Sequence, residues 1–152
     1  MKTQSPPEVV LQLRADPERF TDVRRTVATH LRAWGHPALI DAAQLCVTEI
    51  LANVHRHVAV PECEVRLRVL PETDAVQVSV ADRSPALPVL CAEPDWEAES
   101  GRGMFLIAAT ADLWGTMPTR DGKLVWARLA ARPSGPSKLS AVLLQMREKE
   151  VR

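Results

Sequence analysis

The sequence predicts an α+β protein in which helices pack on one face of a mostly antiparallel sheet. The order of the predicted elements indicates this fold class: a strand, two helices, two strands, a long loop, a helix and two strands. The composition agrees, because the 152 residues combine 46% hydrophobic with 25% charged side chains, the ordinary globular mix. A chain of this length makes about one domain.

The first half of the chain is typical of an edge strand followed by two helices. Val9–Leu13 is a short apolar run, and Asp16-Pro17-Glu18 is typical of a helix start. Apolar residues then recur at spacings of three and four, which predicts an amphipathic helix that ends at Gly35: Phe20, Val23, Val27, Leu31 and Trp34. A second helix is predicted to start near Pro37 and to be mostly buried, because apolar residues cover most of its circumference.

The second half predicts two hairpins, a loop and a short helix. Residues 64–70 and 76–80 alternate with period two, so they form the first hairpin, which runs into Asp82. Residues 84–100 show no period and carry four acidic residues but no Lys or Arg, so we predict a long loop there. Residues 102–111 predict a short helix, and residues 113–119 and 123–129 predict the second hairpin.

Charge and cysteine use exclude several classes of protein. Lys and Arg total 19 and so do Asp and Glu, so the chain lacks the basic excess of a nucleic-acid-coating protein. The three cysteines are widely spaced, which disfavours a zinc site or a disulfide framework and fits reduced thiols in a cytoplasm. No long apolar run predicts a membrane span, and the polar, Pro-rich start predicts no signal peptide.

A polar stripe crosses the second predicted helix. Glu49, Asn53 and His57 are four residues apart, so they share one face of a helix. One interpretation is a solvated face or a set of buried polar groups satisfied by the backbone. The other is chemical: Asn53 offers an oxygen ligand to a phosphate-bound Mg²⁺, and Glu49 accepts a proton from an attacking hydroxyl or water.

Two further motifs each allow a structural and a functional interpretation. Asp82 follows a hydrophobic strand, where it either caps a turn or, as a buried carboxylate, accepts a hydrogen bond from an adenine amino group. Gly101-Arg102-Gly103 opens a helix, so it is either a cap with a loose turn or a phosphate-binding segment at a helix N-terminus. The sequence contains neither a P-loop nor a Rossmann fingerprint.

In their order and spacing these motifs resemble those of the GHKL ATPases, the family of histidine-kinase catalytic domains and gyrase B. Residues 49–57 resemble the N box, residues 82–84 the first glycine box with Ser84 in place of a glycine, and residues 101–107 the second. Residues 111–126 resemble the closing hairpin of one branch, the small anti-sigma factor serine kinases and related regulatory ATP-binding proteins of Gram-positive bacteria.

The resemblance implies a Bergerat ATP-binding fold, a two-layer α/β sandwich whose sheet is mixed and mostly antiparallel with helices on one face. Residues 1–132 would form the histidine kinase-like ATP-binding domain, and residues 133–152 a linker and a C-terminal tail with a helical pattern. The segment from about residue 85 to residue 100 would be the ATP lid. The sequence lacks the D-x-G-x-G of sensor kinases, and from its 152 residues we expect neither a sensor nor a phosphoacceptor-His domain.

The resemblance also assigns site residues for ATP and Mg²⁺. Glu49 would be the catalytic base, Asn53 the metal ligand, and Asp82 the partner of the adenine amino group. The remaining expected nucleotide-binding residues are His57, Ser84, Gly101, Arg102, Gly103 and Met104.

The function implied by the resemblance is that of an ATP-binding anti-sigma factor with serine/threonine kinase activity. It would phosphorylate a STAS-type anti-anti-sigma antagonist, sequester a sigma factor and form a homodimer through the first strand and the sheet edge. The alternative is a non-catalytic ATP-binding module that binds a sigma factor or another regulator without phosphoryl transfer. Arg25 and Arg32 share one face of the first helix, which is either a solvated face or a contact for an acidic partner surface.

Overall fold

The computed structural model describes residues 5–84 and 102–130 of the chain. The expected lid at residues 85–100 and the expected tail at residues 133–152 lie outside the described residues. The described part contains five strands and three α-helices, in the order that the sequence predicts.

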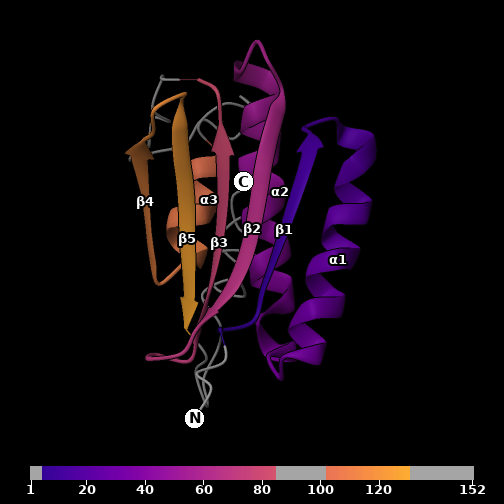
Figure 1. Ribbon diagram of the computed structural model, residues 1–152, viewed down its shortest axis with the longest axis vertical. Helices are drawn as coiled ribbons and strands as arrows, with labels where there is room; N and C mark the ends of the chain where they lie inside the picture. Colours follow the sequence, from indigo (N-terminus) through magenta and orange to yellow (C-terminus); the bar gives the residue numbers. More distant parts are fainter. Residues whose placement is uncertain (1–4, 85–101, 131–152) are drawn as a thin grey trace, which may run out of the picture.

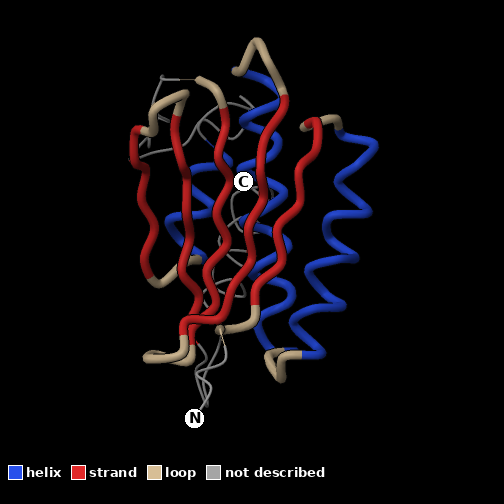
Figure 2. Tube along the Cα trace, viewed as in Figure 1, coloured by secondary structure: helices blue, strands red, loops and turns tan. Residues whose placement is uncertain are grey.

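The five strands form one open sheet in the order β1-β2-β3-β5-β4 (Figure 2). Their bounds are Glu8–Arg14 for β1, Glu62–Leu70 for β2, Ala75–Asp82 for β3, Leu113–Pro118 for β4 and Lys123–Ala130 for β5. All four pairings are antiparallel, and β1 is an edge strand as predicted. The mostly antiparallel α+β architecture is therefore confirmed, while the described residues contain no parallel pair that would make the sheet mixed.

The helices are α1, Phe20–Ala33, α2, Ile40–His57, and α3, Arg102–Thr110. Figure 1 shows α2 and α3 behind the sheet, with α1 beside α2 on the β1 side. Short 3₁₀ helices that begin at Pro17 and Pro37 precede α1 and α2, since a fixed φ and a missing N–H suit a helix start. Gly35 ends α1 as predicted, because its φ of +81° belongs to the left-handed region that stops a helix.

The core lies between the helices and one face of the sheet. Period-two alternation sends every second side chain of β2, β3 and β5 to that face, among them Val65, Leu67, Val76, Val78, Val80, Val125, Ala127 and Leu129. On α2, Cys46, Val47 and Leu51 are fully buried. The stretch Pro37–His57 is long and apolar enough to cross a membrane by composition, but in this fold it is the central core helix, and that role accounts for its apolarity.

No described helix covers the other face of the sheet (Figure 1). Val10 on β1 and Leu113 and Met117 on β4 alternate onto that face, and they are 41%, 51% and 51% exposed. Val10 lies on one edge strand and Leu113 and Met117 on the opposite edge strand, with β2, β3 and β5 between them, so these side chains do not form one continuous apolar patch.

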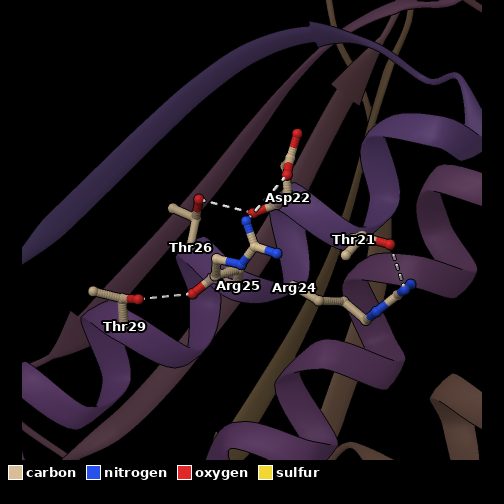
Figure 3. A network of polar contacts seen from close by, with 6 residues as sticks. All are labelled: Thr21, Asp22, Arg24, Arg25, Thr26 and Thr29. Carbon is tan, nitrogen blue, oxygen red and sulfur yellow. Dashed lines mark hydrogen bonds and ion pairs between the residues drawn. The ribbon is translucent and has the colours of Figure 1, made fainter.

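The outer face of α1 carries a network of polar contacts within the helix (Figure 3). Arg25 forms an ion pair with Asp22 three residues earlier, at 3.6 Å between Nη1 and Oδ1, and both side chains are mostly exposed. The hydroxyls of Thr26 and Thr29 donate hydrogen bonds to the carbonyl oxygens of Asp22 and Arg25. These contacts are internal to the helix, as the interpretation of a solvated face expects.

Candidate functional site

The strand β3 ends in a buried carboxylate. Val76, Val78 and Val80 are fully buried beneath the helices, and period-two alternation places Asp82 on the same face. Its side chain is only 1% exposed. An ionised carboxylate in such a place is unfavourable unless it has charged or hydrogen-bonding partners.

The two carboxylate oxygens of Asp82 have different surroundings. Oδ1 accepts a hydrogen bond of 2.8 Å from the backbone N–H of Ser84, which is the turn-capping role expected of an Asp at a strand end. Oδ2 lies 2.7 Å from the Lys123 ammonium as an ion pair. That contact lacks hydrogen-bond geometry, so among the described residues Oδ2 is a buried acceptor without a hydrogen-bond donor. The turn-capping interpretation of Asp82 therefore concerns Oδ1, while Oδ2 has the unused acceptor site that the functional interpretation requires.

Lys123 is a site residue that the sequence analysis did not identify. The register of β3 with β5 sets Asp82 directly opposite Lys123, and the lysine is only 8% exposed. Buried lysines are rare unless they are paired. The sequence offers one signal, a lysine directly after a turn glycine, and that signal has meaning only once the register of the two strands is known.

The turn between β4 and β5 closes tightly over the end of β3. The N–H of Thr119 donates to the Gly122 carbonyl at 2.9 Å, and the N–H of Gly122 donates to the Thr119 hydroxyl at 3.0 Å. A Cβ at position 122 would collide with the Asp82 carbonyl oxygen and lie 2.6 Å from the Arg83 Cα. Only glycine allows this approach, because backbone atoms cannot move aside cheaply.

Replacing Gly122 with alanine is therefore expected to lower the free energy of unfolding by about 1–3 kcal/mol, the usual range for overpacking. The end of β3 must shift, so Asp82 and Lys123 lose their present positions. Urea denaturation measures the effect, with Asp121→Ala at the exposed neighbouring position as the matched control. Equal stability of the two variants would show that the turn has room for a side chain.

The polar stripe lies on the flank of α2 that is turned away from α1. The Gln44 side-chain amide donates to the Arg24 carbonyl at 2.9 Å, which marks the side of α2 that faces α1. Asn53 follows nine residues later, about two and a half turns at 3.6 residues per turn, so it lies on the opposite side. α3 packs on α2 as well, and Figure 1 shows α2 between α1 and α3. The flank next to α3 therefore carries the polar stripe. Glu49 and Asn53 are half-buried there, and His57 is exposed.

Three parts of the site meet at the same end of the sandwich. Residues 58–61 join the end of α2 to the start of β2, and Glu64 near that start pairs with Ala81 near the end of β3. α3 ends just before β4, whose first residue pairs with Arg128 near the end of β5. Asp82 pairs with Lys123 at the start of β5, which is the opposite end of that strand. α3 therefore begins at the end of the sheet where Asp82 lies. Figure 1 shows the end of β3, the start of β5 and the last turn of α2 together at its upper end.

The second glycine box lies at the start of α3. Arg102 and Gly103 are its first two residues, and Gly101 lies outside the described residues. Met104 is 3% exposed and belongs to the hydrophobic core, so its side chain anchors this turn. Contacts to a phosphate from Met104 would thus come from its backbone N–H, one of the N–H groups that a helix start leaves unpaired.

A buried thiol lies near each candidate carboxylate. Burial and then the charge of Glu49 raise the pKa of the Cys46 thiol from 9.0 to about 12. Burial, and then the charges of Asp82 and Glu62, raise the pKa of the Cys63 thiol from 9.0 to about 12. Both thiols are protonated at neutral pH, so neither is an activated nucleophile there. The described residues also contain no cluster of three His, Cys, Asp or Glu side chains that could hold a metal ion.

Comparison with known proteins agrees with this fold. The crystal structure of the RsbU and RsbW domains of Rv1364c from Mycobacterium tuberculosis superposes with a TM-score of 0.63 at 17% identity, a likeness of fold. The match covers 84% of this chain but only 34% of that one, so this chain spans about a third of its length. No curated protein matches significantly. A family model described as the histidine kinase-like ATPase domain matches residues 13–129, so the chain belongs to the histidine kinase-like ATPase domain family.

Proposed function

We propose that this protein is an ATP-binding anti-sigma factor with serine/threonine kinase activity that acts in the cytoplasm. It would phosphorylate a STAS-type anti-anti-sigma antagonist and sequester a sigma factor. The family supports ATP binding, usually with Mg²⁺, and the likeness to a structure that includes an RsbW domain agrees with the anti-sigma branch.

The observation that carries the proposal is the unused acceptor at Asp82 Oδ2. It is buried and lacks a hydrogen-bond donor among the described residues. It lies at the end of the sandwich where the polar flank of α2 and the first turn of α3 also lie. The amino group of adenine is a donor that satisfies such an acceptor, and a helix start suits the phosphates at the other end of the nucleotide.

The side chains of α2 also fit a phosphate-bound metal. Asn53 has one neutral oxygen on a half-buried flank, and Mg²⁺ on a nucleotide needs only one or two protein ligands. When bound, Mg²⁺ neutralises charge on the phosphates. The residues expected to complete the nucleotide site are His57, Ser84, Gly101, Arg102, Gly103 and Met104.

Glu49 is the proposed base for phosphoryl transfer. It lies one turn before Asn53 on the same flank, so the two residues are neighbours on the helix surface. Glu49 would accept the proton of the Ser or Thr hydroxyl that attacks, while the rest of the site positions the two substrates. A pure binding module, the alternative, does not need this carboxylate.

The edge strand β1 supports the proposed homodimer through the first strand and the sheet edge. Val10 on β1 exposes apolar surface, whereas Leu113 and Met117 lie on β4 at the opposite edge of the sheet. A second copy that packs against β1 and covers Val10 would remove this side chain from water.

Calorimetric titration of the purified chain with ATP, with and without Mg²⁺, tests the proposed function. We expect saturable binding that Mg²⁺ strengthens. Asn53→Ala removes a ligand oxygen, so it is expected to lose roughly tenfold or more of affinity in the presence of Mg²⁺ and little in its absence. Gln44→Ala is the matched control, because this amide lies on the opposite flank of the same helix. A folded wild-type chain that binds no ATP under either condition would contradict the proposal.

A further inference from the structure

Lys123 and Asp82 place a cation and an unused acceptor next to each other in the buried end of the sheet. The Lys123 Nζ and the Asp82 Oδ2 are 2.7 Å apart, and the side chains are 9% and 1% exposed. The contact lacks hydrogen-bond geometry, so it neutralises charge without using the acceptor site of Oδ2. Ser84 engages only Oδ1.

Burying a lysine costs more free energy than burying a neutral side chain. Neutralising the charge of Asp82 is therefore a weak explanation for a lysine at this position. A buried ion pair is often no more stabilising than apolar residues of the same volume. The ammonium has three N–H donors and no acceptor, whereas the ionised carboxylate accepts only. The pair therefore offers a ligand one acceptor and one donor at adjacent positions.

We propose that Lys123 is a specificity-determining residue that reads the purine ring of the bound nucleotide. The Lys123 ammonium donates a hydrogen bond to ring nitrogen N1, and Asp82 Oδ2 accepts one from the neighbouring 6-amino group. This inference rests on the proposed function, because it requires ATP to bind at Asp82.

The two contacts together select adenine against 6-oxopurines. On adenine the 6-amino group donates and N1 accepts, and these atoms are separated by one ring carbon. On hypoxanthine and guanine an oxygen acceptor replaces the amino group and N1 carries a hydrogen. In the same pose the oxygen would face the carboxylate and the N1–H would face the ammonium, so both contacts become repulsive. A site built to hydrogen-bond one pattern rejects the opposite pattern strongly, because its buried groups are left unpaired.

The test compares ATP with 1-deaza-ATP, which has a C–H in place of N1 and keeps the amino group. Wild-type protein is expected to bind ATP roughly tenfold or more tightly than 1-deaza-ATP, because 1-deaza-ATP loses a hydrogen bond to a charged group. Lys123→Met removes the donor, so the ratio of the two affinities is expected to fall close to one. Lys123→Gln keeps a neutral N–H donor and is expected to retain part of the ratio.

Arg83→Met is the matched control, because it removes an exposed positive charge from the residue next to Asp82 and leaves the donor in place. Its ratio is expected to equal that of the wild type. Equal binding of ATP and 1-deaza-ATP by the wild type would overturn the inference without any variant. A Lys123→Met protein that binds ATP more tightly would also overturn it, since Lys123 would then be a competitor of the base. A wild type that binds neither nucleotide would instead contradict the proposed function.

Discussion

Asp82→Asn is expected to lower ATP affinity by roughly 100-fold or more, the effect of truncating one member of a buried, charged contact. The substitution preserves shape, but it replaces an oxygen that accepts with an amide that also donates. The Lys123 ammonium, 2.7 Å from Oδ2 in the native protein, loses its counter-ion. Calorimetric titration with ATP and Mg²⁺ measures the loss.

The matched control is Asp74→Asn, the same substitution just before the first residue of β3. Asp74 has a 76% exposed side chain and a φ of 52°, a conformation that asparagine adopts readily. We expect it to bind ATP as the wild type does. Unchanged affinity in Asp82→Asn would remove Asp82 from the nucleotide site.

A stability measurement separates loss of binding from loss of fold. Breaking a buried pair by removing one partner costs about 3–5 kcal/mol, so Asp82→Asn is expected to unfold at a lower urea concentration. The double variant Asp82→Asn/Lys123→Met removes the orphaned charge and is expected to recover much of this loss, yet to remain defective in ATP binding. Recovery of both properties would assign Asp82 a structural role alone.

Glu49→Gln is expected to slow phosphoryl transfer by roughly 10²–10⁴-fold, the usual contribution of a positioned general base. ATP affinity is expected to change little, because the amide keeps the size of the side chain and Asp82 lies on a different element. The measurement is the transfer of labelled phosphate from ATP to the STAS-type antagonist that the wild-type protein phosphorylates.

Asp41→Asn provides the control for Glu49→Gln. Asp41 is an exposed carboxylate in the first turn of the same helix, far from the end where the site lies. Equal transfer rates for Glu49→Gln and Asp41→Asn would show that Glu49 is not the base. A wild type that binds ATP and STAS-type antagonists but transfers phosphate to none of them would favour the non-catalytic binding module.

The local periodicity of apolar side chains predicted most of the fold. The alternation of residues 64–70 and 76–80 predicted β2 and β3 within two residues of their observed bounds, because a strand in a two-layer sandwich must show one apolar face. The apolar spacing of the first two helices, the glycine after α1 and the prolines before α1 and α2 likewise depend on local backbone geometry alone.

The candidate site was predicted only in part, for the same reason. Helical spacing placed Glu49, Asn53 and His57 on one stripe, but the contact of Gln44 with α1 was needed to show that the stripe lies on the flank next to α3. The hydrophobic strand before Asp82 suggested a buried carboxylate. Its single unused oxygen could not be foreseen, because that depends on which groups from other strands reach it.

The sequence by itself determined the elements, their order and the family motifs, since these follow from side-chain period and short-range backbone preference. The tertiary structure alone decided the pairing of Asp82 with Lys123 and the close approach of Gly122 to the end of β3. Both depend on the register between strands that are some forty residues apart in the chain, and a one-residue shift would turn Lys123 to the other face. Register is a property of the whole packed sheet, so no local pattern near residue 123 specifies it.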